Sequence, residues 1–133
     1  MYKEENRLKN IVEEFPWEEW GKFPNPSQYG TSLRLIFRKI LSKSNRPGVY
    51  QVRDKNTHEW ILFGEGGSLE VRMGSLLPQS DGGVGTRRNS SKRKDISKNI
   101  NDREYRVLYT ETKEEAKEID SFLKSLKLHR FNT

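Results

Sequence analysis

The fold of this chain is decided by residues 48–67, which read GVYQVRDKNTHEWILFGEGG and contain two apolar runs on either side of a polar turn. Residues 49–52 and 60–63 are rich in β-branched and aromatic side chains, which are typical of strands. Residues 54–57 have the polar composition of a turn. The stretch therefore predicts a β-hairpin, which is followed at residues 64–67 by a glycine-rich bend.

The residues after the hairpin predict further α and β elements. A short helix is expected to begin near Ser68, a residue type that favours helix N-caps. The alternation of Tyr, Val and Tyr within residues 105–109 predicts a third strand. Thr112 and Glu115 have the spacing of a capping box at the start of a last helix. The apolar face of that helix comprises Ala116, Ile119, Phe122, Leu123 and Leu126. We therefore predict an α+β fold with a small three-stranded, mainly antiparallel sheet flanked by helices.

The first 44 residues predict an N-terminal helical extension. Residues 2–15 and 33–41 place apolar side chains at helical spacing. Between them, residues 17–26 form an aromatic connector, and we expect its tryptophans to cover one end of the core. The remaining residues, 45–133, are interpreted as the main domain. Within that domain, residues 78–103 are interpreted as a basic insert, an exposed loop followed by a short helix.

Composition limits the classes of protein to which the chain can belong. It has 133 residues, of which 32% are hydrophobic, and a formal net charge of +6 with a pI near 9.6. One domain with a modest core is expected, and the positive charge favours a polyanionic partner. The absence of cysteine excludes disulfides and zinc–thiolate sites. No apolar run is long enough to cross a membrane and the first residues are too charged for a signal peptide, so we expect a soluble, cytoplasmic protein.

Four short motifs occur in a fixed order along the chain. The first is Gly48-Val49-Tyr50, and the second is Leu62-Phe63-Gly64. Arg72 follows Gly64 by eight residues, with Ser68-Leu69 between them. The fourth is the pair Glu115-Ala116, then Asp120, then Phe131-Asn132. In these motifs and their spacing, residues 48–132 resemble the GIY-YIG nuclease domain.

The resemblance implies a metal-dependent DNA endonuclease that hydrolyses phosphodiester bonds. It implies that Asp120 holds one divalent cation, Mg²⁺ or Mn²⁺, and that Tyr50 acts as a base or positions the attacking water. Arg72 would stabilise the phosphate, and Asn132 would be a supporting polar residue. Such chemistry is reasonable in itself, because a phosphodiester transition state gathers negative charge that a metal ion and an arginine can stabilise.

Two positions differ from the family pattern. Residue 62 is leucine where the family has its second tyrosine, and Asp120 is one methylene shorter than the family's glutamate. These differences favour an alternative, a catalytically degenerate nucleic-acid-binding module with the same fold. A third possibility is a protein-interaction module that uses residues 1–44.

Each candidate residue also has an ordinary structural interpretation. Tyr50 could be a packed core aromatic, and Arg72 could be a surface cation. Asp120 lies at the boundary of the apolar face of the last helix, where solvated acids are common. The histidines are interpreted as incidental, although His129 lies close enough to Asn132 in sequence to approach the site. The basic run predicts contacts to DNA phosphates, without base reading, from Arg87, Arg88, Lys92, Arg93 and Lys94.

Overall fold

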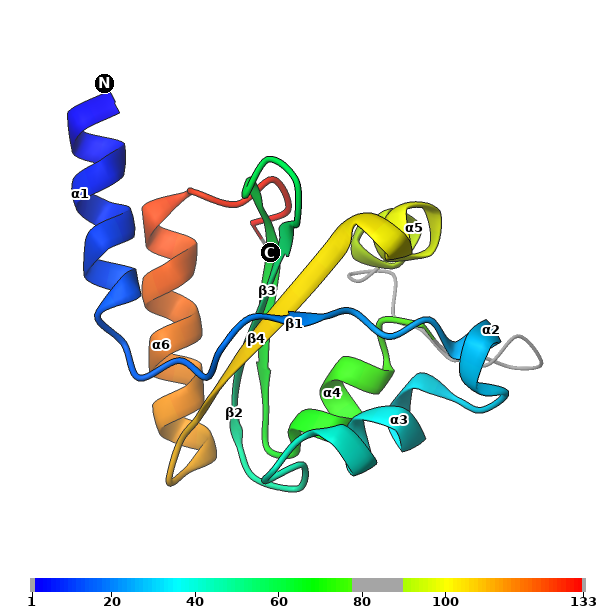
Figure 1. Cartoon of the computed structure of the whole chain (residues 1–133). Coiled ribbons are helices and arrows are strands. Elements are labelled where there is room, and N and C mark those ends of the chain that lie inside the picture. Colours follow the sequence, from blue (N-terminus) through cyan, green and yellow to red (C-terminus); the bar gives the residue numbers. More distant parts are fainter. Residues whose placement is uncertain (1, 78–89, 133) are drawn as a thin grey trace.

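The computed structural model describes residues 2–77 and 90–132. Its helices and strands, labelled in Figure 1, are α1 (Tyr2–Glu13), β1 (Gly21–Lys22), α2 (Pro26–Tyr29), α3 (Leu33–Ile40), β2 (Gly48–Asp54), β3 (Trp60–Gly66), α4 (Leu69–Gly74), α5 (Ser90–Asn99), β4 (Arg103–Tyr109) and α6 (Lys113–Leu126). The 3₁₀ turn η2 (Ile100–Asp102) joins α5 to β4. The α+β class is therefore confirmed. In the described ranges no helix has the length and apolar character that a membrane crossing requires.

The sheet has four strands in the order β1-β4-β2-β3, and its paired strands are antiparallel. The predicted hairpin is β2 and β3, in which Tyr50 lies opposite Gly64. The prediction of three strands is wrong by one, because Gly21 and Lys22 pair with the edge of β4. A strand of two residues is too short to show an alternating pattern, so only the pairing partner reveals it.

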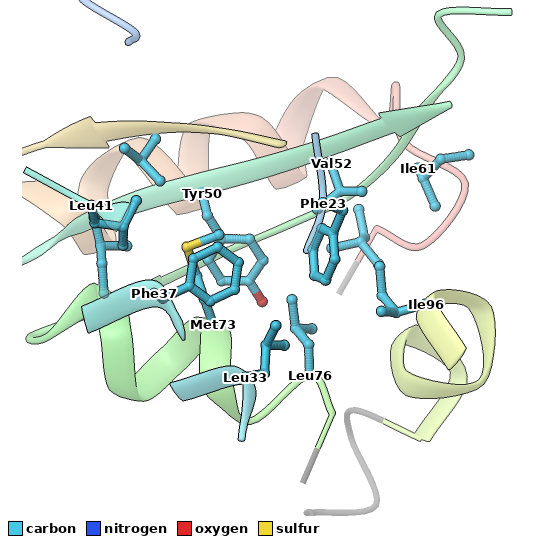
Figure 2. Close-up of a cluster of buried hydrophobic side chains, with 13 residues drawn as sticks. Phe23, Leu33, Phe37, Leu41, Tyr50, Val52, Ile61, Met73, Leu76 and Ile96 are labelled. Atoms are coloured by element: carbon cyan, nitrogen blue, oxygen red, sulfur yellow. The ribbon is translucent and has the colours of Figure 1, made fainter. Parts of the chain in front are cut away.

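Helices cover both faces of the sheet (Figure 1). On one face, side chains of α3, α4 and α5 pack with Tyr50 and its neighbours in a buried cluster, shown in Figure 2. On the other face, α1 and α6 form a second cluster that includes Val12, Ala116 and Leu123. Both clusters combine residues from before and after position 45, so α1 and α3 belong to the same packed unit as the sheet.

Local sequence signals explain where α6 begins. Thr112 occupies the N-cap position, and its side-chain oxygen accepts a hydrogen bond of 3.1 Å from the backbone N–H of Glu115. This is the bond that the capping box predicts. The apolar face expected for this helix packs on the second cluster. At α4, Ser68 is the N-cap residue as predicted, but its side chain makes no capping hydrogen bond with the described residues.

The tryptophans of the aromatic connector pack around a buried arginine. Trp17 joins the second cluster, and its indole N–H donates to the carbonyl of Val12 at 2.9 Å. The guanidinium of Arg106 lies 4.4 Å from the ring centroids of both Trp17 and Trp20. Arg106 also donates to both carboxylate oxygens of Glu13. These contacts attach α1 to the face of β4 and agree with the expectation that the tryptophans cover the core.

The end of the chain runs along the outer edge of β3. The backbone N–H of Arg130 donates to the carbonyl of Trp60 at 3.1 Å, and that of Phe131 donates to Ile61 at 2.8 Å. A parallel bridge joins Leu62 and Phe131. This segment covers part of an edge strand whose hydrogen-bonding groups would otherwise face water. It also places Asn132 near the point where β3 leads into the glycine-rich bend.

His129 is buried on the face of the sheet that carries the second cluster. Its ring lies 4.5 Å from that of Phe63, and it is 7% exposed. Arg106 donates to the Gln51 side-chain oxygen at 2.7 Å, which turns the Gln51 amide nitrogen toward the His129 Nε2 at 2.9 Å. Nε2 must therefore accept this hydrogen bond, as only a neutral imidazole can. Burial, followed by the charge of Lys92, lowers the pKa of His129 from 6.5 to about 3.

This pKa shift predicts a loss of stability in acid. Between pH 6.5 and 3 the unfolded chain protonates residue 129 while the folded chain does not, so stability falls with decreasing pH by up to about 1.4 kcal/mol per pH unit. We expect His129→Gln to flatten the dependence of the unfolding free energy on pH between 7 and 4. Urea unfolding at a series of pH values measures this slope.

The other histidine provides the control for this measurement. His58 lies exposed in the hairpin turn, so His58→Gln should keep the slope of the wild-type chain. Equal slopes for the two variants would contradict the assignment of the acid effect to residue 129.

Candidate functional site

Tyr50 lies on β2 and extends across β3, the edge strand of the sheet. Its ring covers Gly64 so closely that a Cβ atom on Gly64 would lie 2.4 Å from the tyrosine hydroxyl oxygen. The side chain is 1% exposed and packs among core residues, including Phe37 and Met73 (Figure 2). The glycine of the second motif is therefore required here by the close approach of this tyrosine.

The charges around Tyr50 come from three other elements. Burial raises the pKa of the Tyr50 hydroxyl to about 12, although the positive charge of Arg72 lowers it. Asp120 and Glu65 raise the pKa further, so both carboxylates lie within electrostatic range of this hydroxyl. At neutral pH the hydroxyl is protonated, and it can donate a hydrogen bond or position a water molecule. Of the two roles that the resemblance implies for Tyr50, this pKa favours the positioning role.

Arg72 lies on α4, directly after the glycine-rich bend. A Cβ atom on Gly66 would lie 2.9 Å from the Cβ of Arg72, so the bend must pass very close to the helix. The Arg72 Nε is buried and has no hydrogen-bond partner among the described residues. Beside it a pocket of about 310 Å³ is lined by the bend, Val71, Arg72 and Lys113. The guanidinium interacts with the Tyr50 hydroxyl, while its Nε is left without a partner among the described residues.

Asp120 lies on α6 and is only 9% exposed. The ordinary interpretation of this residue, a solvated acid at the boundary of the apolar face, therefore does not describe it. The helix turns Asp120 toward the positive charges of Lys92 and Lys124, which compensate for the loss of water around the carboxylate. Its ion pair with Lys124, one turn later, measures 3.4 Å.

Unpartnered polar atoms gather around these residues. Among the described residues, four buried side-chain atoms lack a hydrogen-bond partner, and three of them belong to Glu65, Arg72 and Asn132. The amide nitrogen of Asn132 donates to the carbonyl of Lys124 at 2.8 Å, which fixes the side chain beside α6. Its oxygen is one of the unpartnered atoms. Buried polar groups are normally satisfied, so these exceptions make their residues candidates for contact with a ligand.

The residues of the basic run differ in their exposure, and two of them are not described by the structure. Arg87 and Arg88 lie outside the described residues. Lys94 is exposed on α5, and Arg93 is half-buried and donates to the carbonyl of Ser75 at 3.2 Å. Lys92, expected to be exposed, is only 2% exposed, so the prediction of a surface contact is wrong for this residue.

The packing of α5 explains the burial of Lys92. Lys92 and Ile96 are one turn apart on the helix face that packs against the rest of the protein. The Lys92 ammonium donates to the carbonyl of Phe63 on the outer edge of β3 at 2.7 Å. Because the basic run is mostly charged, its sequence shows no apolar pattern for this helix face, and the burial of the face was not predicted. Glu65 was missed as well, because a single acid after the second motif carries no signal.

The donor atoms at this edge fit a hard divalent cation. Within residues 2–77 and 90–132 no group of three or more His, Cys, Asp or Glu side chains could hold a metal ion. The oxygens of Asp120, Glu65 and Asn132 remain, and two of these side chains have an unpartnered oxygen. Mg²⁺ prefers oxygen ligands and keeps several of its waters, so it requires only one or two carboxylates. The residues present therefore fit the ion that the resemblance implies.

Comparisons with known proteins add no further information about the site. No family model, no curated protein and no solved structure matches the chain. The account of the site therefore rests on the geometry described above.

The close approach of Gly64 and Tyr50 gives a direct prediction. We expect Gly64→Ala to displace the Tyr50 ring, to lower the free energy of unfolding by about 1–3 kcal/mol as other overpacked substitutions do, and to reduce any activity of the site. Gly67→Ala is the matched control in the same bend, because a Cβ there would meet only Lys113, at an ordinary 3.5 Å. Thermal unfolding of both variants measures the difference, and equal stabilities would show that Tyr50 is not held against Gly64.

Proposed function

We propose that this protein is a metal-dependent DNA endonuclease of the GIY-YIG type, which hydrolyses phosphodiester bonds at the edge of its sheet. The observation that carries this proposal is the convergence of Tyr50, Arg72 and Asp120 from β2, α4 and α6, with electrostatic influence of Arg72 and Asp120 on the Tyr50 hydroxyl. A phenol, a guanidinium and a carboxylate around one point could position water, bind a phosphate and hold a metal ion, which are roles that phosphodiester hydrolysis can use. The resemblance in motif order supports the same conclusion.

Each residue has a role that follows from its environment. Arg72 binds the phosphate through its unpartnered Nε and stabilises the negative charge that gathers in the transition state. Tyr50, protonated at neutral pH, holds the attacking water or a phosphate oxygen through its hydroxyl. Asp120 would hold Mg²⁺ or Mn²⁺, and Asn132 would be a supporting polar residue. When bound, this ion supplies Lewis-acid stabilisation of the reacting phosphate.

The proposed partner is DNA, held mainly through its phosphates. The chain carries a net charge of +6, and Lys94 and Lys98 are exposed on α5, the helix that also carries Lys92. Arg87 and Arg88 precede this helix and remain proposed contacts. Because these contacts release counterions, we expect the affinity for DNA to fall steeply as salt is raised.

Leu62 supports the alternative function, a binding module without catalysis. This side chain is fully buried in the apolar cluster next to the sheet edge. It cannot supply the hydroxyl of the family's second tyrosine. If that hydroxyl is essential for hydrolysis, the same surface would still bind nucleic acid but would not cut it.

The two functions are separated by incubating supercoiled plasmid with the protein and Mn²⁺, with and without EDTA. Under the endonuclease proposal, the wild-type chain nicks the plasmid only when metal is present, and Tyr50→Phe nicks it much more slowly. This substitution removes the hydroxyl but keeps the buried ring, so the fold is preserved. Intact plasmid that both proteins retard equally on a gel, with or without EDTA, would establish the binding module instead.

A further inference from the structure

The pocket of about 310 Å³ beside Arg72 is larger than one phosphate group needs, and the proposed function assigns a role only to Arg72 among its lining residues. Its walls come from the end of β3 and the glycine-rich bend, from α4 and from the first residue of α6. Figure 1 shows that α6 begins at the end of the sheet where β3 leads into α4. The volume lies near the lower end of the range for sites that bind small molecules.

Lys113 is the lining residue that no motif includes. It is exposed at the start of α6, and its aliphatic chain lies along the bend, because a Cβ atom on Gly67 would meet the Lys113 Cδ at 3.5 Å. Its ammonium has no ion-pair or hydrogen-bond partner among the described residues. A cation in the first turn is not favoured by the helix dipole. The stability of α6 therefore does not explain a lysine at this position.

The charges that line the pocket favour an anion. Arg72 supplies a second cation, which interacts with the Tyr50 hydroxyl and has a buried Nε without a partner in residues 2–77 and 90–132. Glu65 supplies one carboxylate, and no ion pair in the same ranges joins it to Arg72 or Lys113. Two cations and one carboxylate leave the lining with a net positive charge.

The uncharged part of the lining indicates which class of anion fits. Ser68 provides a hydroxyl that makes no capping hydrogen bond with the described residues, and Val71 provides an apolar side chain on a residue that is 46% exposed. Among the described residues no aromatic side chain lines the pocket, so a base has no ring on which to stack. A sugar–phosphate unit matches this lining, because its oxygens accept from lysine and hydroxyl groups and its sugar can pack against Val71.

We propose that this pocket is a second phosphate subsite, in which Lys113 binds the DNA phosphate next to the one that Arg72 binds. The ligand is the sugar–phosphate backbone of one strand, held without recognition of its bases. The inference rests on the proposed function for the position of the first phosphate, but it does not require that the strand be cut.

The first test measures the affinity of a fluorescein-labelled duplex DNA, in EDTA and over a range of salt concentrations, for the wild-type chain and Lys113→Met. We expect this variant to bind about tenfold more weakly, as the loss of one hydrogen bond from a charged group does. The slope of log affinity against log salt should decrease in magnitude by about one, because one phosphate contact is lost.

Lys55→Met is the matched control. Lys55 is exposed in the turn between β2 and β3, at the opposite end of β3 from the bend. Its variant removes the same charge but should keep the wild-type salt slope. Equal slopes for the two variants would overturn the proposal, because Lys113 would then contribute only to the net charge.

The second test locates the ligand by NMR of the ¹⁵N-labelled wild-type chain in EDTA, with the duplex or with inorganic phosphate at the same concentration. We expect the duplex to shift the backbone amide signals of Gly66, Gly67 and Ser68, and inorganic phosphate to leave them in place. Unmoved signals with the duplex would overturn the subsite. Equal shifts with inorganic phosphate would identify a site for free phosphate and overturn the assignment to DNA.

These tests separate the inference from the proposed endonuclease function. A chain that never nicks plasmid, but in which Lys113→Met lowers the salt slope, would keep the subsite and lose the catalytic proposal. A chain that nicks plasmid, but in which Lys113→Met binds duplex DNA as Lys55→Met does, would keep the endonuclease and lose this inference.

Discussion

Replacing Arg72 by methionine should slow the metal-dependent nicking of plasmid by about 100- to 1,000-fold, the effect of removing one positioned donor from a transition state. The Arg72 Nε is buried and has no hydrogen-bond partner among the described residues, and the side chain lines a pocket, where under the proposed function its guanidinium would bind the phosphate. The aliphatic part of the side chain packs against Gly66, and methionine retains most of that packing. Initial rates of nicking under excess enzyme measure the effect.

Arg46→Met is the matched control for the loss of a guanidinium. Arg46 forms a surface ion pair with Glu111, in which the two side chains are 40% and 82% exposed. This variant should nick plasmid within a few-fold of the wild-type rate. Similar losses in the two variants would mean that Arg72 contributes only to the net positive charge.

The largest expected effect on stability comes from Asp95. Replacing it by alanine should lower the free energy of unfolding by about 3 kcal/mol or more, because it leaves a buried cation without its main partner. Arg103 donates to both carboxylate oxygens of Asp95 at 2.7 and 2.8 Å, and both side chains are 4% exposed. Asp54 remains as a second partner of Arg103 at 2.9 Å, so the loss should lie near the lower end of the range for buried pairs. Urea unfolding at pH 7 measures the change.

An exposed ion pair provides the comparison. Glu4 and Arg7 are bound at 2.7 Å on α1, with side chains 63% and 60% exposed. Glu4→Ala should therefore lower the free energy of unfolding far less than Asp95→Ala does, because solvent screens an exposed pair. If the two substitutions lower the free energy of unfolding equally, burial does not strengthen the contribution of the Asp95–Arg103 pair to stability.

Much of the fold could be predicted because its signals are local. The β2–β3 hairpin is encoded by two apolar runs and a polar turn, and α6 by a capping box with an apolar face at helical spacing. The strand β1 could not be predicted, since two residues carry no periodicity and their pairing depends on β4. The burial of Lys92 and Asp120 has the same explanation. Each depends on contacts with distant segments, such as the Phe63 carbonyl on β3 for Lys92 and Lys92 on α5 for Asp120, which no pattern within α5 or α6 contains.

The residues of the candidate site could be predicted from motif spacing, whereas the fold was predicted from local periodicity and capping signals. Tyr50, Arg72 and Asp120 were selected through their spacing in a motif, and none of them differs in type from an ordinary core or surface residue. The structure brings them within electrostatic range of one another. Glu65 was not predicted, since it belongs to no motif, and Lys92 was predicted only as an exposed DNA contact, whereas the structure buries it. A structure was also needed to reveal that burial keeps the Tyr50 hydroxyl protonated.

The central claim is that one metal ion, held by Asp120, acts at a single site. Its most direct test is the rate at which Asp120→Ala nicks supercoiled plasmid over a range of Mn²⁺ concentrations. Glu118→Ala is the control, because it removes an exposed carboxylate from the same helix. The account predicts that the Glu118 variant nicks plasmid as the wild-type chain does and that the Asp120 variant leaves it intact at every Mn²⁺ concentration. Wild-type nicking by the Asp120 variant, with the same dependence on Mn²⁺, would contradict it.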